Sequence, residues 1–341
     1  MTDLFAGATG TRPRRTRGAV ALALVASVAA GAVAVFPAGA QAPYPQRPVM
    51  LIVPYGAGGI ADTGMRIVAD KLSARLGQQV LVDNRPGAGG IVAAKAGSSA
   101  VPDGHTLLMT GNNNAISEVL FKSLPYNILT DFASTSTTSF FDLLMVTREE
   151  SPLKTLQDVV KAAQANPGKL NIGTINPGST QNLAAELFRS TAGVNVTIVP
   201  FRTSPDMTGA ILRGDVDLAF EFYAAIQGQI LDHKMRVLAS TGPKRTAYLP
   251  DVPTAQEGGI KGYEVVSWNG ISVPAATPKP IIDALSRAIN EVLPLPDVQE
   301  KSQRLGMDMH ASTPDEMTAR MKSDIAKWGA VTEKAGIPKR D

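Results

Sequence analysis

VMLIVPYGAGGIADTGMRIVADKLSARL, residues 49–76, joins a short apolar run to a glycine-rich loop and then to a helical pattern. The first five residues are all apolar, which is typical of a strand buried on both faces. From Ala61 to Leu76 apolar residues recur at helical spacing, so we expect an amphipathic helix that Gly77 ends. A buried strand followed directly by such a helix predicts the first unit of an α/β fold.

The same alternation of strand and helix continues along the chain. Further strands are expected at 80–82, 106–109, 170–173, 196–199, 216–220 and 237–239, with helices between most of them. Thr155 caps a helical pattern in mid-chain, and Thr313 with Glu316 forms a capping box that starts the last helix. Alternating strands and helices pair in parallel through right-handed crossovers, so we expect two sheet-forming sets in two domains.

The N-terminal residues have the layout of an export signal. Four arginines between positions 12 and 17 precede an apolar run over 18–36 and a small-residue stretch over 38–42. This order predicts a secretory signal peptide over residues 1–40, cleaved after Ala40, and hence a periplasmic protein. A retained membrane anchor is the alternative, but the run is rich in Ala and Val and no second apolar segment follows.

Charge is balanced in the rest of the chain. The sequence has 33 Lys+Arg and 30 Asp+Glu, of which residues 1–40 hold four and one. The remainder therefore carries 29 of each and a formal net charge of zero. A neutral protein is not drawn to nucleic acid or to an anionic membrane, so we expect neither as a partner.

Residue types that carry hydrolytic, redox or metal chemistry are scarce. The chain has no cysteine, and its three histidines, His105, His233 and His310, stand in no metal-ligand spacing. It also lacks a G-x-S-x-G nucleophile motif. We therefore expect no catalytic residue, no bound metal and no cofactor.

Two strand–loop–helix segments share one design. Residues 51–62 and 170–182 each run from a strand through small residues into the start of an amphipathic helix. The first N–H groups of a helix have no intrahelical partner and carry partial positive charge, so they bind anions without a basic side chain. One such loop in each domain, facing across a cleft, would hold the two ends of a dicarboxylate. The alternative is that both loops merely connect a strand to a helix.

A dinucleotide site is a further alternative. Gly56, Gly58 and Ala61 follow a strand in the spacing of a dinucleotide-binding fingerprint, and Asp83 ends the next strand. This interpretation would make the chain an NAD(P)-dependent oxidoreductase. The step from Ala61 to Asp83 is long for the motif, and free NAD(P) is not expected outside the cytoplasm, so carboxylate binding is favoured.

The chain resembles a known family, the tripartite tricarboxylate transporter substrate-binding proteins, also called Bug proteins. The resemblance covers nearly all of the chain after the signal peptide. Its motifs are YP (44–45), RP (47–48), VPY (53–55), AGG (57–59) with Asp62, NRPGAGG (84–90), PDGHTLL (102–108), LPY (124–126), NPGKL (166–170), VPF (199–201), LPDVPT (249–254), WNG (268–270) and TPDE (313–316).

The resemblance implies a two-lobed, type II periplasmic-binding-protein fold of the Venus flytrap kind, in which each lobe is a mixed, mostly parallel sheet flanked by helices. Residues 41–140 with 241–341 would form one lobe, and residues 141–240 the other. It also implies a non-enzymatic, monomeric protein that delivers a dicarboxylate, tricarboxylate, amino acid or aromatic carboxylate to the membrane permease of a tripartite tricarboxylate-type transporter. A sensor that reports its ligand to a membrane kinase would have the same sequence features.

Members of the family hold carboxylates mainly with backbone amides and waters from the two strand–loop–helix segments. The candidate ligand-binding residues are Tyr55, Ala57, Gly58, Gly59, Ile60, Asp62, Gly111, Asn112, Thr174, Asn176, Gly178, Ser179, Thr180, Gln181, Phe201, Arg202, Thr203 and Glu221.

Several of these positions depart from the family pattern. Asn182, Thr203 and Glu221 stand where the family commonly has His, Gly and Asp, which leaves the identity of the ligand open. Arg202 is a candidate for pairing a carboxylate and Glu221 for pairing an amine; for both, a surface or hinge ion pair is the alternative. The aromatic side chains that would wall an aromatic ligand, or else pack inside the lobes, are Tyr55, Phe201, Phe222 and Tyr223.

Overall fold

A ten-stranded sheet organises the part of the chain that the computed structural model describes, residues 44–341. The expected signal peptide, residues 1–40, lies outside these described residues. The strands follow the order β2-β1-β3-β9-β4-β7-β5-β6, with β8 and the two-residue β10 (Asp308–Met309) also paired to β4. The α/β organisation expected from the sequence is confirmed. The predicted parallel pairing holds at the two ends of this order, whereas the strands around β4 are antiparallel.

The first sheet half contains β1 (Val49–Val53), β2 (Val80–Asn84), β3 (Thr106–Gly111) and β9 (Val266–Pro274). β1 lies parallel to both β2 and β3, and β9 runs antiparallel to β3. Successive residues of a strand face opposite sides, so Leu51 packs against α1 (Ile60–Leu76) and α8 (Lys279–Val292), while Ile52 packs with α2 (Ile91–Ser98). A 3-10 turn, η1 (Ala88–Gly90), precedes α2, and α9 (Pro296–Gln303) follows α8.

The second sheet half contains β5 (Asn171–Ile175), β6 (Thr197–Phe201), β7 (Leu218–Phe222) and β8 (Met235–Ser240). β5 lies parallel to β6 and β7. One face packs against α6 (Ser204–Arg213) and α7 (Tyr223–Leu231), and the other packs against α4 (Leu156–Ala165) and α5 (Thr180–Ala192). The expected strand at 216–220 begins two residues later, at Leu218.

One strand, β4 (Phe132–Arg148), belongs to both halves. Its residues 132–142 pair with β9, and its residues 143–146 pair with β7. The sequence pattern did not indicate this 17-residue strand, because its first part is rich in Ser and Thr and two bulges interrupt the alternation. The buried hydroxyls of this first part are hydrogen-bonded; for example, Thr135 Oγ1 donates to the carbonyl oxygen of Ile271 in β9 at 2.7 Å.

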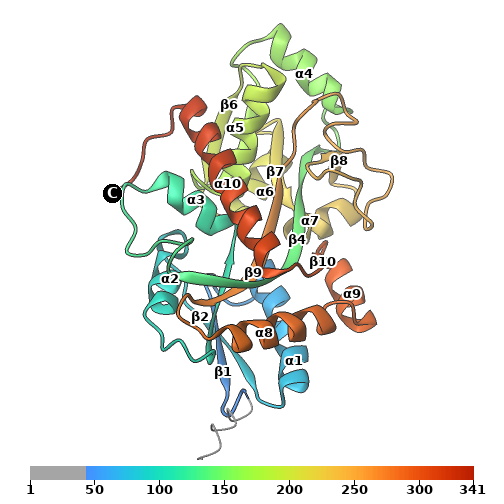
Figure 1. Ribbon diagram of the computed structural model, residues 1–341. Helices are drawn as coiled ribbons and strands as arrows, with labels where there is room; N and C mark the ends of the chain where they lie inside the picture. The colour runs from blue at the N-terminus through green and yellow to red at the C-terminus, as the bar shows by residue number, and fades with distance from the viewer. Residues whose placement is uncertain (1–43) are drawn as a thin grey trace, which may run out of the picture. The chain divides into compact units, whose positions relative to one another are not determined.

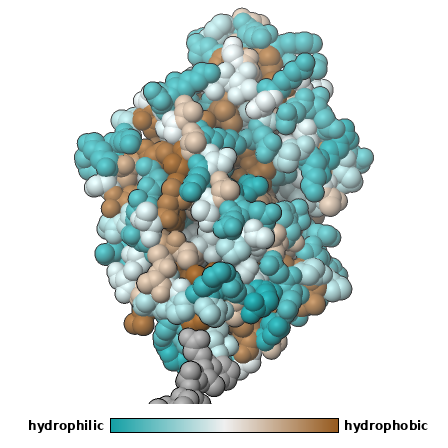
Figure 2. All heavy atoms as spheres, viewed as in Figure 1, coloured by the Kyte–Doolittle hydropathy of each residue, from teal (hydrophilic) through white to brown (hydrophobic). Residues whose placement is uncertain are grey.

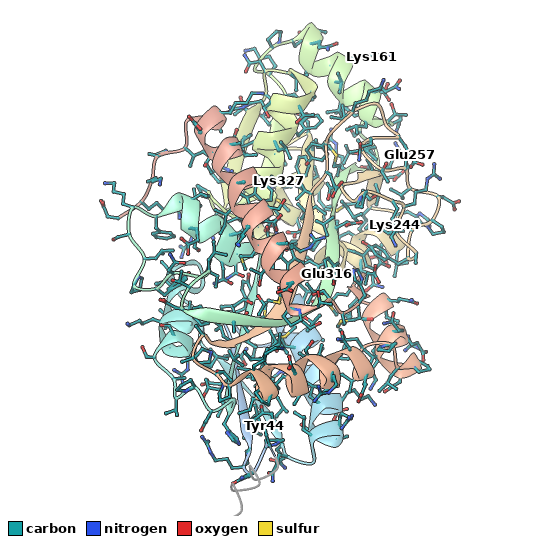
Figure 3. The ribbon with its side chains drawn as sticks, viewed as in Figure 1. Tyr44, Lys161, Lys244, Glu257, Glu316 and Lys327 are labelled. Carbon is teal, nitrogen blue, oxygen red and sulfur yellow. The ribbon has the colours of Figure 1, made fainter. Side chains whose placement is uncertain are left out.

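The last helix, α10 (Pro314–Ala335), packs across both halves (Figure 1). It contacts α3 (Asn112–Leu120) on one side and α5 on the other. Its capping box is confirmed: the N–H of Glu316 donates to Thr313 Oγ1, and the N–H of Thr313 donates to the Glu316 carboxylate. Figure 3 shows Glu316 near the start of the helix and Lys327 further along it. Lys327 Nζ donates to the carbonyl oxygen of Glu264 at 2.6 Å, so the helix is tied to the segment before β9.

The face drawn in Figure 2 is mostly hydrophilic, with apolar side chains gathered over the region of α3. Within residues 44–341, no helix combines the length and the apolar character that crossing a bilayer requires.

We expect Gly111→Ala to destabilise the fold. Gly111 pairs with Asn269 at the end of β3, and a Cβ atom there would overlap the backbone carbonyl oxygen of Trp268. Relieving that overlap requires a backbone shift, which should lower the free energy of unfolding by about 1–3 kcal/mol in urea titrations. Gly228→Ala is the control: it lies within α7 with open space at its Cβ position, and should raise stability by about 0.5–1 kcal/mol. Equal stability of Gly111→Ala and wild type would contradict this account.

The stability of this fold should fall as pH rises toward neutrality, because of Asp142. This residue lies where β4 passes between the two sheet halves; burial, with smaller effects from Asp308 and Glu264, raises its pKa to about 7. The folded state therefore holds a proton that the unfolded chain releases at lower pH, and stability declines from about pH 4 to about pH 7.

Asp142→Asn should remove that decline. We expect the variant to exceed wild type by at least about 1 kcal/mol near pH 8, with the advantage shrinking toward about pH 4, in urea titrations across pH. Asp251→Asn, which alters an exposed carboxylate, is the control and should change little. A constant difference between Asp142→Asn and wild type at all pH values would argue against the assignment.

Candidate functional site

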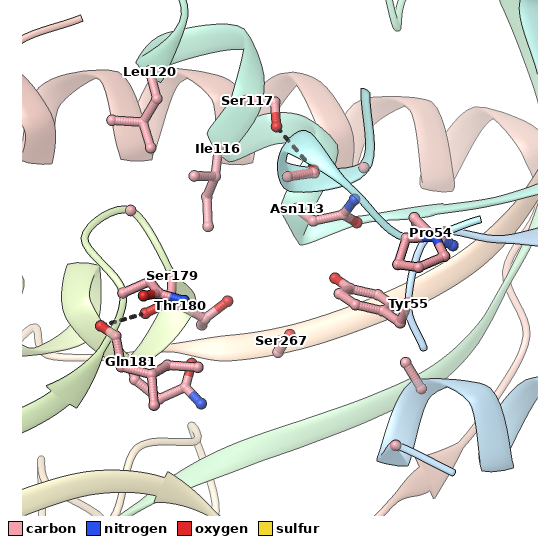
Figure 4. A pocket seen from close by; sticks show the side chains of 18 of the residues that line it. Pro54, Tyr55, Asn113, Ile116, Ser117, Leu120, Ser179, Thr180, Gln181 and Ser267 are labelled. Carbon is pink, nitrogen blue, oxygen red and sulfur yellow. Dashed lines mark hydrogen bonds between the residues drawn. The ribbon is translucent and has the colours of Figure 1, made fainter. Parts of the chain in front are cut away.

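A cavity of about 710 Å³ lies where loops of the two sheet halves meet. The loop after β1 contributes residues 54–56 and 59–61, and the loop after β5 contributes residues 175–181. Phe141 of β4, near the end of the segment that pairs with β9, and Phe222, the last residue of β7, complete the wall. Figure 4 shows Tyr55 and Asn113 on one side of the open space and Ser179, Thr180 and Gln181 on another. The two loops singled out in the sequence therefore line one cavity.

The start of α1 is open to an anion. Gly59 is its N-cap residue and has no side chain to accept from the first N–H groups. The first helical backbone bond joins the N–H of Thr63 to the carbonyl oxygen of Gly59 at 2.9 Å, so the N–H groups of Ile60 and Ala61 have no acceptor within the helix. Both residues line the cavity. The helix end thus offers donors and partial positive charge to a ligand.

Asp62 holds this loop rather than lining the cavity. Its carboxylate accepts from the N–H of Gly58 at 2.8 Å, from Arg66 Nε at 2.9 Å and from Asn84 Nδ2 at 2.8 Å. Burial alone raises the pKa of Asp62, but the hydrogen bonds from Arg66, Gly58 and Asn84 outweigh it and hold that pKa below its ordinary value. Gly58 has φ +86°, a left-handed conformation that glycine adopts without strain.

The start of α5 repeats this arrangement with a neutral residue. Asn182 Oδ1 accepts from the N–H of Gly178 at 3.0 Å, as Asp62 accepts from Gly58. Here, however, the N-cap residue Ser179 uses its hydroxyl oxygen to accept from the N–H of Asn182 at 3.1 Å. The N–H groups of Thr180 and Gln181 come before the first backbone bond of the helix. Gly59 has no side chain to cap the corresponding N–H of Asp62, so the second loop offers one open donor fewer than the first.

α3 contacts the second loop and α10. Asn112 Nδ2 donates to Thr180 Oγ1 at 2.9 Å, and Asn112 Oδ1 accepts from Trp328 Nε1 at 2.7 Å. Gly178 lies so close to Leu120 that a Cβ atom there would overlap the leucine side chain. Asn112 thus links α3, α5 and α10 just behind the cavity.

The candidate residues divide into two groups. Those that line the cavity are Tyr55, Gly59, Ile60, Asn176, Gly178, Ser179, Thr180 and Gln181. Those that do not are Ala57, Gly58, Asp62, Gly111, Asn112, Thr174, Phe201, Arg202, Thr203 and Glu221.

Several residues of the second group support the first. Glu221 is 1% exposed and accepts from Gln181 Nε2 at 3.0 Å, which fixes the orientation of that amide; burial raises the pKa of Glu221. Thr174 Oγ1 accepts from Asn182. Thr203 instead caps α6 through the N–H of Asp206, and the side chain of Arg202 is exposed, away from the cavity lining. Of the four aromatic candidates, Tyr55 and Phe222 line the cavity, whereas Phe201 and Tyr223 pack with α6 and α7.

Sequence reasoning missed the contribution of α3 and of the chain's end. Asn113, Ile116, Ser117 and Leu120 line the cavity from one face of α3, and their spacing of three and four residues is a helical signal that was available. The glycines at 87, 89 and 90 and residues 267–269 also line it, and all of them except Ser267 lie in motifs already quoted. Arg340 lines it as well, and no local pattern marks that residue.

A family model described as "Tripartite tricarboxylate transporter family receptor" matches residues 65–337. The chain belongs to this family. Protein BugT of Bordetella pertussis is 31% identical over 295 residues, which is 86% of this chain and 90% of that protein. The resemblance identified from the sequence is therefore confirmed, and the family is one of solute-binding receptors rather than enzymes.

Solved structures of related proteins match the whole described unit. The R. palustris protein Rpa4515, solved with adipate, superposes with a TM-score of 0.77 at 30% identity over 87% of this chain and 100% of its own. The periplasmic binding protein BugD gives a TM-score of 0.74 at 29% identity with the same coverage. These matches confirm the two-lobed type II binding-protein fold of this receptor.

The oxidoreductase alternative is not supported. The receptor family accounts for the Gly56–Ala61 loop as a binding loop. In addition, Asp83, which would have to hold a ribose, pairs its carboxylate with Arg85 Nε at 2.8 Å.

We expect Asp62→Asn to weaken the first binding loop. The variant loses the charge-assisted bond from Arg66, so its free energy of unfolding near pH 7 should fall by about 1–3 kcal/mol. Because the folded pKa of Asp62 is lowered, this stabilisation is present above the ordinary aspartate range and is lost as pH falls through the lowered value, so the difference between variant and wild type should shrink on acidification. Asp70→Asn, on the exposed face of the same helix, is the control in these denaturation curves.

Proposed function

We propose that this receptor captures a small carboxylate in the cavity between its two binding loops. The observation that carries the proposal is that α1 and α5 both begin at the same cavity, with N–H groups of Ile60, Ala61, Thr180 and Gln181 outside the helical bonding pattern. Neutral amide donors suit a carboxylate, which only accepts hydrogen bonds. The adipate in the related R. palustris structure supports this class of ligand.

We propose that the two lobes close around the bound ligand. In our proposal the carboxylate first meets the Gly59 loop, which has the more open donors, and the Ser179 loop then closes over it. Closure is favoured only by contacts absent from the open form. In our proposal, the bond from Asn112 to Thr180 and the contact of Leu120 with Gly178 form on closure.

The lobes that move would be residues 41–140 with 241–341 and residues 141–240. Contacts of the segment 241–265 favour placing the second boundary later. The hydroxyl of Tyr263 donates to the carbonyl oxygen of Ala184 in α5, and the N–H of Val265 donates to the carbonyl oxygen of Thr241. We therefore place the hinge near residues 142–143 of β4 and 265–266 at the start of β9.

Receptors of this family serve transporters, and family members such as BugD are periplasmic binding proteins. We propose that this chain is exported by its N-terminal signal peptide to the periplasm. There it would act as a monomer and deliver its ligand to the membrane permease subunits of a tripartite tricarboxylate-type transporter.

Gly59→Asp tests the binding mode. An aspartate N-cap accepts from the N–H groups at the start of the helix, so it should raise or preserve thermal stability while occupying the donors and repelling an anion. We expect carboxylate affinity to fall at least about tenfold, measured by calorimetry on protein unfolded and refolded to remove bound ligand. Gly59→Ala adds a Cβ atom without a cap or charge and is the matched control; its Cβ would contact only the carbonyl oxygen of Gly56, at 3.8 Å.

The ligands for this test come from a thermal-shift screen of di- and tricarboxylates, amino acids, aromatic carboxylates and NAD(P). A ligand at about 100 times its dissociation constant adds about 2.7 kcal/mol, which shifts the melting temperature by a few degrees. Binding of NAD(P) alone, or unchanged carboxylate affinity in Gly59→Asp, would refute the proposal.

A further inference from the structure

Arg340 is the one charged side chain that lines the cavity within residues 44–341. The other lining residues are apolar side chains, glycines and neutral polar side chains such as Asn113, Asn176 and Gln181. The helix N-termini contribute only partial charges. The full positive charge at this cavity is therefore concentrated at one residue near the end of the chain.

The backbone of Arg340 is held in place on both sides. Its N–H donates to the carbonyl oxygen of Leu120 at 2.7 Å, and its carbonyl oxygen accepts from the N–H of Lys122 at 2.9 Å. This pairing forms a parallel bridge between Phe121 and Arg340 just after α3. Figure 1 shows the chain leaving α10 and returning to this region beside α3. Two backbone bonds fix where the side chain starts, although the residue itself is exposed.

Most N–H donors of the Arg340 guanidinium group form no hydrogen bond within residues 44–341. Its Nη2 donates to the carbonyl oxygen of Pro177 at 2.5 Å, in the loop of the opposite sheet half. A guanidinium group carries five N–H donors, so this bond uses a small part of its capacity. The neighbouring acid, Asp341, pairs with Lys122 instead, at 2.6 Å between Nζ and Oδ1. A backbone carbonyl oxygen accepts a hydrogen bond but does not neutralise the charge.

We propose that Arg340 selects ligands with a second carboxylate, which it binds at the mouth of the cavity while the first lies at the start of α1. This inference rests on the function proposed above and narrows it to dicarboxylates. A carboxylate matches the planar fork of a guanidinium group and forms charge-assisted bonds with it. A monocarboxylate of the same length leaves Arg340 in water and gains nothing from it.

The exposure of Arg340 limits the size of the effect. Solvent-exposed ion pairs are weak and are screened by salt, whereas a bidentate pair at the edge of a closed cavity is stronger. We expect a preference for dicarboxylates of about five- to tenfold from this residue, and a smaller preference at higher ionic strength.

Calorimetry with matched ligand pairs tests this assignment. Succinate, adipate and suberate are each compared with the monocarboxylate of equal chain length, namely butyrate, hexanoate and octanoate, on wild type, Arg340→Gln and Arg340→Lys. Arg340→Gln should lower dicarboxylate affinity about five- to tenfold and change monocarboxylate affinity less than about twofold. Arg340→Lys keeps the charge without the fork and should retain part of the preference. Lys339→Gln, which removes the adjacent tail charge outside the cavity lining, is the control and should leave both affinities unchanged.

Two results would overturn the inference while leaving the proposed function intact. Equal weakening of both ligand series by Arg340→Gln would mean that Arg340 only holds the Pro177 loop, and unchanged affinities would mean that it has no role in binding. If wild type bound no carboxylate of either series or of the wider screen, the proposed function itself would fail, and this inference with it.

Discussion

Backbone hydrogen bonding along β4 is the constraint on which the two-lobed arrangement depends. The strand pairs with β9 up to Asp142 and with β7 from Leu143, so one peptide chain serves both sheet halves without a break. A shared strand keeps the halves in register, and its pairing partner changes where we propose the hinge. The same point carries the half-buried carboxyl of Asp142, whose raised pKa favours the protonated form in the fold. α10 spans the two halves on one side, and the cavity lies among the loops that the strand ends bring together.

The proposed binding mode relies on backbone groups more than on side chains. Each loop uses one residue of the following helix, Asp62 or Asn182, to accept from a left-handed glycine and so to fix the loop's shape. The two loops differ at the N-cap position, where Gly59 leaves helix donors open and Ser179 occupies one of them. In our proposal, this difference makes the first loop the stronger anion site. The first loop tolerates the negative charge of Asp62 because Arg66 and Asn84 donate hydrogen bonds to that carboxylate away from the cavity.

Buried polar residues behind the wall hold the residues that line it. Glu221 orients Gln181, and Asn112 joins Thr180 to Trp328. Such groups are costly to bury unless they are hydrogen-bonded, so their partners are constrained along with them. Substitution at these positions can therefore alter the cavity without contact with a ligand. The departures of Glu221 and Asn182 from the family pattern fall in this supporting layer, as the structure places them.

The sequence by itself determined the strand–loop–helix units and singled out the two loops that line the cavity. Their signals are local: the apolar run at 49–53, the helical spacing after Gly59 and the capping at Thr313 each depend on residues within a few positions. It also determined the family, because many short motifs stand in one order. It did not reveal β4, since buried Ser and Thr with two bulges hide the alternation of a strand. Only the tertiary structure decided that Asp62 and Asn112 support the cavity and that α3 and Arg340 line it. The physical reason is that these roles depend on which groups meet across long sequence separations, such as Arg340 with Leu120 and Pro177, and no local pattern records such a meeting.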